Sequence, residues 1–328
     1  MSNQGFKRID YFNYLDDDSL QITDWQNFYG GTIKGGVNYN INRNMRLFLN
    51  TGYFSKQPIF NSIFLSYRNL INEEATNQTV KAYEIGYSYF NNHFDIDLNA
   101  YYTVWGNRQF TRNMFLDNQD VLYVFDNISQ THKGVEFEIR TKINNKFSLD
   151  GMVSIGDWIY TTNFNAKGTI LDLWGDPTGE TQDSVLVLYG KGLKVGDAAQ
   201  STYSISLNYK PIPTLKLSGT YYIADNLYAP YNIYEDQFYQ EGGQVTKLPR
   251  YAIARVGVYF NKKINDKHLS LRLNINNLFN TLYLAELNTN ALDANGQLYT
   301  PDQVGFYTKN KGYFGFGRTW NLGIKLSF

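Results

Sequence analysis

The chain has 328 residues, enough for a large folded body, and its 30 Lys and Arg balance its 30 Asp and Glu. Because there is no basic surplus to attract phosphates, a nucleic-acid partner is disfavoured. Cysteine is absent, which excludes disulfides, thiol catalysis and cysteine-bound zinc. No stretch reaches the roughly 18 apolar residues of a membrane-spanning helix. The first residues lack the apolar core of a signal peptide, so we expect the chain to begin inside a longer protein.

Aromatic residues make up 17% of the chain, with 28 Tyr and 22 Phe, and these side chains favour strands. Apolar and polar residues alternate in many segments; for example, Phe94, Ile96 and Leu98 alternate with Asp95 and Asp97. A helix cannot keep a two-residue period on one face, so the pattern predicts strands. We predict eleven of them, at residues 29–41, 45–53, 80–90, 94–105, 131–142, 147–156, 200–209, 215–222, 251–260, 269–279 and 312–328.

The connections between these strands alternate in length. Short turns are expected at 42–44, 91–93, 144–146, 211–213 and 262–267, and long connections at 54–79, 106–130, 157–199, 223–250 and 280–311. Such long loops argue against an ordinary compact domain. Tight periplasmic turns opposite long extracellular loops are typical of outer-membrane barrels. The chain is therefore predicted to be all-β and to form an antiparallel transmembrane β-barrel.

Aromatic residues on the predicted outward face lie at two heights. Those beside the short turns are Tyr39, Tyr89, Phe94, Phe147, Tyr209, Phe260 and Phe328, and those towards the long connections are Tyr53, Tyr83, Tyr102, Tyr203 and Tyr221. Two aromatic girdles around an aliphatic band suit a barrel in a bilayer. A soluble β-sandwich is the alternative, but it would not confine the long loops to one edge.

The end of the chain resembles a known sorting element. Residues 317–328 alternate and finish on an aromatic residue, like the C-terminal strand of outer-membrane proteins, which the barrel-assembly machinery recognises. The resemblance assigns that recognition to one face of the strand, formed by Trp320, Leu322, Ile324, Leu326 and Phe328.

Other segments are similar, in the same order, to one family of these proteins. Residues 274–283 (NINNLFNTLY) resemble the N-x-x-N-L-F-N-x-x-Y segment of TonB-dependent receptors. Residues 83–87, 101–108 and 134–138 are similar to mid-barrel hairpins of that family. Residues 58–60 and 11–14 resemble segments of the Bacteroidetes branch of this family.

This resemblance implies a receptor in the outer membrane of a Gram-negative bacterium, with a barrel of about 22 strands around a plug. The eleven predicted strands would be its C-terminal half, contacting outer-membrane lipid, with the plug domain and the N-terminal strands absent. The missing N-terminal segment would contact the TonB–ExbB–ExbD motor. The family's ligands are siderophores, haem, cobalamin and oligosaccharides, and nothing in the sequence selects among them.

The sequence shows no signature of catalysis, a cofactor or a metal site. His93, His132 and His268 are far apart and lack metal-ligand spacing. The acidic run 16–18 could suggest calcium, but no calcium-loop pattern follows it, so a solvated loop is favoured. We therefore expect a protein that is not an enzyme.

Two groups of residues are the functional candidates. Charges predicted to face the barrel interior would line water or hold a polar plug: they are Glu84, Asp95, Asp97, Glu136, Glu138, Arg140, Asp150, Arg255 and Arg272. Aromatic residues of the long connections would contact the ligand or pack the loops together: they are Trp105, Trp158, Trp174, Tyr228, Tyr231 and Tyr234.

Two other functions remain open. A passive pore or adhesin on a small barrel would need an additional strand, within 3–14, that closes the sheet. A soluble carbohydrate-binding or glycan-cleaving β-protein is the other alternative, and as an enzyme it would need a carboxylate pair at one cleft.

Overall fold

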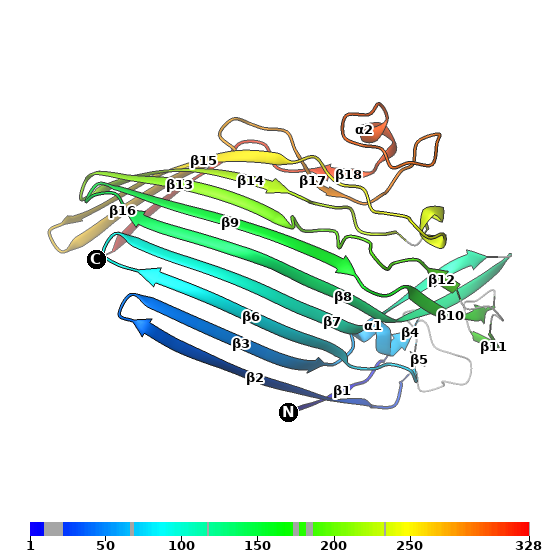
Figure 1. Cartoon of the computed structure of the whole chain (residues 1–328). Coiled ribbons are helices and arrows are strands. Elements are labelled where there is room, and N and C mark those ends of the chain that lie inside the picture. Colours follow the sequence, from blue (N-terminus) through cyan, green and yellow to red (C-terminus); the bar gives the residue numbers. More distant parts are fainter. Residues whose placement is uncertain are drawn as a thin grey trace.

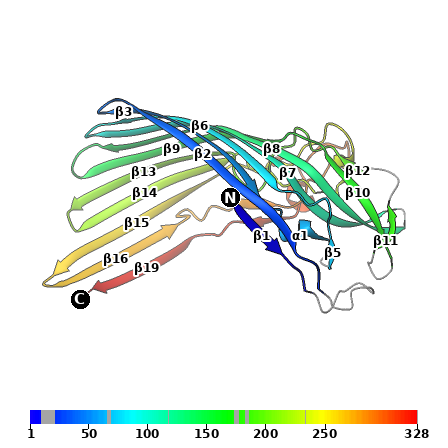
Figure 2. The same cartoon turned by 90° about the horizontal axis from the view of Figure 1, so that it is seen from below.

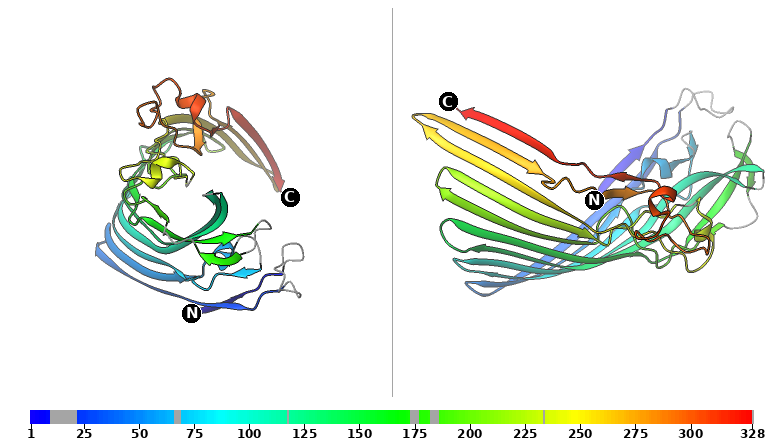
Figure 3. Two further views of the ribbon diagram at one scale, coloured as in Figure 1. Left: turned by 90° about the vertical axis from the view of Figure 1, so that its right-hand side faces the viewer. Right: turned by 90° about the horizontal axis from the view of Figure 1, so that it is seen from above.

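The computed structural model describes residues 1–9, 22–65, 69–116, 118–172, 177–181, 186–232 and 234–327. Strands that pair antiparallel follow one another across one large sheet, in the order β1-β2-β3-β6-β7-β8-β9-β13-β14-β15-β16-β19. The sheet is long and strongly curved (Figure 1), and it forms an open arc when viewed end-on (Figure 3, left). Among the described residues β1 and β19 do not pair with each other, so the arc is not closed.

The strands along the arc are β1 (Ser2–Phe6), β2 (Gln26–Asn42), β3 (Met45–Lys56), β6 (Gln78–Phe90), β7 (Phe94–Leu116), β8 (Gln119–Lys142), β9 (Phe147–Tyr160), β13 (Ser201–Ile212), β14 (Leu215–Asp225), β15 (Tyr251–Ile264), β16 (Lys267–Asn276) and β19 (Thr319–Ser327). The shorter elements are α1 (Phe60–Ile63), β4 (Phe64–Leu65), β5 (Leu70–Ile71), β10 (Phe164–Leu171), β11 (Pro177–Thr181), β12 (Leu186–Leu188), η1 (Asp236–Tyr239), β17 (Leu284–Leu287), α2 (Phe306–Lys309) and β18 (Gly312–Phe314). None of the described helices has the length and apolar character that crossing a membrane requires.

Ten of the eleven predicted strands are present, two of them much longer than expected, and the eleventh is divided. The predicted loop at 106–130 is wrong, because β7 continues to Leu116 and β8 starts at Gln119. The hairpin contains register shifts, and Asn107 and Asn127 have positive φ angles of 55° and 50°. Such bulges interrupt the two-residue alternation of apolar and polar residues. The sequence pattern therefore ends near residue 105, although the strands themselves continue.

The last predicted strand, 312–328, is divided into β18 and β19. Between them, the Tyr283 ring fills the space where a side chain at Gly315 would lie, and the Gly315 N–H donates to the Tyr283 carbonyl at 2.8 Å. The close contact between the segments around Gly315 and Tyr283 therefore interrupts the predicted strand.

A strand at the N-terminus does exist, but it does not close a small barrel. β1 pairs with Gln26–Gly30 of β2, at the end of β2 that lies beyond its pairing with β3. Within the described part of the chain it makes no pair with β19.

Three of the five short turns, those at Asn42, Asn91 and Asn144, are stabilised by asparagine side chains. Asn91 Oδ1 accepts hydrogen bonds from the backbone N–H groups of His93 and Phe94, both at 2.8 Å. Asn144 Oδ1 accepts in the same way from Lys146 N–H at 2.8 Å. An Asn side chain that bonds to the backbone two residues further on reverses the chain within a few residues. The short turns all lie at the same end of the sheet (Figure 2).

The strand register separates an apolar outward face from a polar concave face. Ile85 lies opposite Leu49 on one neighbour and Ala100 on the other, and this agreement continues across the sheet. Outward Ile85 is 56% exposed, whereas Ser88 and Asn208, on the concave face, are 2% and 8% exposed because side chains crowd inside a curve. The interior charges predicted from the sequence all fall on the concave face in this register.

Large rings on the concave face lie flat across glycines of neighbouring strands. Phe48 lies opposite Gly86, and its ring occupies the space that a side chain at Gly86 would need. Tyr101 covers Gly134 in the same way, with its hydroxyl 2.5 Å from the position of a Cβ there. Rings placed over glycine protect backbone that would otherwise be bare, and they keep the inner wall smooth.

We predict that Gly86→Val destabilises the folded protein by about 1–3 kcal/mol, the usual cost of forcing extra atoms into a packed site. Gly219→Val is the control, since a Cβ at Gly219 meets nothing within 4 Å. Heat-induced unfolding of both variants in detergent measures the difference. Equal melting temperatures would contradict this description of the wall.

We also predict that Leu98→Arg or Leu271→Arg costs about 2–4 kcal/mol in a bilayer, because both side chains point outward from the middle of the sheet. Asn274→Arg should cost much less, because Asn274 faces the polar side, where it bonds to Tyr259 and Asn321. Reversible unfolding in lipid vesicles compares the three, and a similar loss for all would mean that the two faces are assigned incorrectly.

Candidate ligand-binding region

The long connections lie together at the end of the sheet opposite the short turns (Figure 1). There the β7–β8 hairpin extends past the neighbouring strands, and β10 pairs along β8 from Asp126 to Asp120. β10 also pairs with β11 and β12. The connections that follow β7 and β9 are therefore built on strands.

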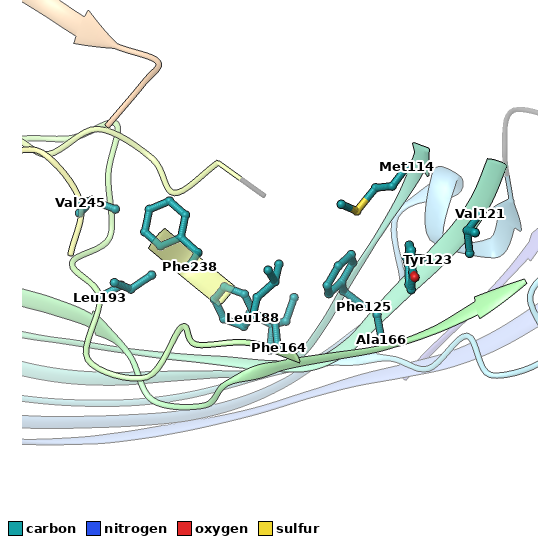
Figure 4. Close-up of a cluster of buried hydrophobic side chains, with 11 residues drawn as sticks. Met114, Val121, Tyr123, Phe125, Phe164, Ala166, Leu188, Leu193, Phe238 and Val245 are labelled. Atoms are coloured by element: carbon teal, nitrogen blue, oxygen red, sulfur yellow. The ribbon is translucent and has the colours of Figure 1, made fainter. Parts of the chain in front are cut away.

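An apolar cluster joins these segments (Figure 4). Its buried members are Met114, Val121, Tyr123, Phe125, Ile128, Phe164, Ala166, Leu188, Leu193, Phe238 and Val245. They come from β7, β8, β10, β12, η1 and the segments around them, so the connections share one core. Burying apolar side chains from separate connections offsets the entropy lost by ordering long loops.

Tyr231 packs into this cluster. Its ring centroid lies 4.8 Å from that of Phe164 and 5.4 Å from that of Tyr160. Burial raises the pKa of the Tyr231 hydroxyl far above its usual value, and neighbouring Tyr160 adds to the rise, while Arg112 and Arg108 act against it. Tyr231 is therefore uncharged at physiological pH and packs the connections together. Tyr228 packs against the same cluster.

Trp105, His132 and Trp158 form an aromatic row on the concave wall. The His132 ring stacks on Trp158, with centroids 5.1 Å apart and planes 13° from parallel, and Trp105 lies 6.5 Å away on a tilted plane. The Trp158 Nε1–H donates to the Tyr101 hydroxyl at 3.0 Å, which fixes the indole. All three ring residues are partly exposed, so the row presents aromatic surface to the interior.

The sequence assigned Trp105 and Trp158 to the long connections, but they lie within β7 and β9. The hairpin around Asn144 and Asn145 already implies the arrangement: pairing outward from that turn places His132 opposite Trp158. The signal was present in the turn position, but the predicted strand ended too early at residue 156.

A second candidate surface surrounds Tyr234 and Arg112, beside a hollow of about 310 Å³ between the α1 segment and the β7–β8 hairpin. The Tyr234 hydroxyl donates to the Asn113 carbonyl at 3.4 Å, and the Arg112 guanidinium lies 5.5 Å from the centre of the Phe110 ring. Tyr234 is 62% exposed. The sequence indicated Tyr234 but gave no reason to select Arg112, because the register shift near Asn107 hides which way that part of β7 faces.

Several predicted site residues lie outside the described residues: Trp174, Phe328, the acidic run 16–18 and the aromatic segment 11–14. The rest of the predicted C-terminal face is present on β19, where Trp320, Leu322, Ile324 and Leu326 are all exposed. His93 and His268 lie at the short-turn end, away from His132. Within the described ranges, no three His, Asp or Glu side chains form a group that could hold a metal ion.

Solved structures share this architecture. The copper transporter OprC matches with a TM-score of 0.61 at 10% identity over 93% of this chain and 40% of its own. The siderophore receptor PiuA from Acinetobacter baumannii matches with a TM-score of 0.58 at 14% identity, over 92% and 36%. The FrpB iron transporter from Neisseria meningitidis (F3-3 variant) matches with 0.55 at 14%, over 92% and 39%. The chain thus spans well under half the length of these proteins, and identities this low show the fold alone.

The family comparison is more specific. No curated protein matches the chain in sequence. The family model described as TonB dependent receptor-like, beta-barrel matches residues 7–278, which is more than half of the chain. This family consists of transport receptors of the Gram-negative outer membrane. The chain therefore belongs to the TonB-dependent receptor β-barrel family.

Proposed function

We propose that the protein is the C-terminal half of an outer-membrane receptor that imports a scarce ligand by TonB-dependent active transport. The observation that supports this most strongly is the family match over residues 7–278, on a sheet with an apolar outward face and a polar concave face. Such a sheet suits lipid outside and a wet or plugged lumen inside. The aromatic connections would then form the extracellular surface.

We further propose that the barrel is completed by other strands of the same polypeptide, with a plug in its lumen and a segment that reaches the TonB–ExbB–ExbD motor. Two observations support this. The chain covers 36–40% of the solved relatives described above. The arc is also open, and unpaired backbone at its two edges cannot be left in contact with lipid.

The ligand contacts we propose are the Trp105–His132–Trp158 row and the Arg112–Tyr234 hollow. Both combine aromatic faces with a hydrogen-bonding or charged group, as binding sites for small molecules commonly do. The solved relatives named above transport copper, iron or siderophores, so metal chelates are the first ligands to test.

A passive pore on a small barrel is less well supported. It would need β1 to close the sheet, and β1 pairs only with β2 among the described strands. The two functions differ in energy dependence, because a pore works without the TonB motor.

The test is growth under metal limitation on a panel of iron and copper chelates, with the gene deleted and then restored in full length. We expect growth on one chelate to depend both on this gene and on TonB. Uptake that needs the gene but persists in cells lacking TonB would overturn active transport in favour of the pore.

For the chelate that the wild-type protein imports, we predict that Trp158→Ala weakens binding roughly tenfold, equivalent to about 1.4 kcal/mol. Loss of a stacked ring removes an interaction of that order. Tyr102→Ala, an aromatic on the outward face of β7, is the control and should leave the Kd unchanged. Equal effects on both, or normal affinity in Trp158→Ala at wild-type surface abundance, would remove the aromatic row from the site.

A further inference from the structure

The charge of the concave face changes across the arc. On β2 and β3 it carries the cations Lys34, Arg46 and Lys56, and on β6 to β9 it carries carboxylates together with cations: Glu84, Asp95, Asp97, Glu136, Glu138, Asp150, Arg108, Arg140 and Lys142. On β13 to β19 it carries cations only, and we name these the basic wall: Lys210, Lys216, Arg255, Lys263, Arg272 and Lys325. On the described strands from β13 to β19 along the arc, no Asp or Glu faces the interior, because Asp225 points outward.

The cations of the basic wall lie close together. Lys216, Tyr259 and Arg272 occupy one row across three neighbouring strands, and the Lys216 ammonium lies 5.7 Å from the centre of the Tyr259 ring. Lys325 lies opposite Ser270 on the next strand, two positions nearer the short turns than Arg272. Because neighbouring strands are about 4.8 Å apart, these charges form one surface.

These cations have no carboxylate partner in the described part of the chain, where none lies within ion-pair distance. On β7 and β8, by contrast, Arg140 pairs with Asp95 at 3.2 Å and with Glu138 at 2.8 Å. Gly323 lies opposite Arg272, and a Cβ at Gly323 would meet nothing within 4 Å. The cations are thus presented on an open surface.

We propose that the basic wall docks an acidic surface of the plug domain. This inference rests on the proposed function, which places a plug in the lumen. A body that fills the lumen would desolvate these cations, and desolvated charges require partners of opposite sign. Most of the wall lies in the half of the sheet nearer the short turns, away from the aromatic row and the long connections. A ligand arriving from outside would meet those surfaces first, so the plug is the occupant that fits this depth.

The test uses the full-length receptor with Lys216→Glu and Arg272→Glu combined. Adjacent Lys262 and Lys263 supply a matched pair, because Lys263 faces the interior and Lys262 faces outward. Plug seating is measured in the purified receptor by the rate of protease cleavage within the plug. In cells it is measured by sensitivity to a large antibiotic that the outer membrane excludes.

We expect the double variant to speed plug cleavage at least tenfold and to sensitise cells, with a smaller effect for Lys263→Glu and none for Lys262→Glu. If the double variant assembles poorly, Lys216→Gln with Arg272→Gln should show the same loss of plug protection at high salt. Normal protection in these variants, with or without weaker chelate binding, overturns the proposal; weaker binding would assign the wall to the ligand path. Failure of the proposed function is distinguishable, because the wild-type receptor would then show no TonB-dependent uptake.

Discussion

The constraint on which this structure depends is the register between neighbouring strands. A side-chain period of two means that a slip of one residue would move a whole strand's apolar set to the other face. Here the partners agree across the arc: Leu49, Ile85, Ala100, Val135 and Ile155 lie in one line over five strands. The apolar belt, the polar wall and the placement of Trp105, His132 and Trp158 follow from that agreement. The Asn-stabilised turns support it between β2 and β3, β6 and β7, and β8 and β9, because each turn sets the pairing of the two strands that it joins.

The strands, their turns and their two faces could be predicted from sequence because all three depend on local alternation. The prediction failed where local geometry breaks the alternation, at the bulged β7–β8 hairpin with Asn107 and Asn127. It also failed at Gly315, where contact with Tyr283 depends on a residue about thirty positions away.

The candidate site was predictable to a lesser degree. Aromatic composition indicated Trp105, Trp158, Tyr231 and Tyr234, but it could not distinguish rings buried between the connections from rings exposed on the concave wall. Tyr231 is enclosed by rings from β7, β9, β10 and η1, whereas Trp158 stacks on His132 at the wall. That distinction depends on how separate connections fold over one another, and no short sequence window contains it.

The flat rings over Gly86 and Gly134 have a mechanical consequence. Surfaces whose side chains interdigitate resist sliding, because each displacement must lift one residue out of the space between others. A wall on which Phe48 and Tyr101 lie against the sheet offers few such spaces. In the receptor proposed above, a plug seated on it would be held by hydrogen bonds and charges, which can break one after another and re-form with water. Traction along the barrel axis would then meet low friction, and the sheet could keep its register while its contents move.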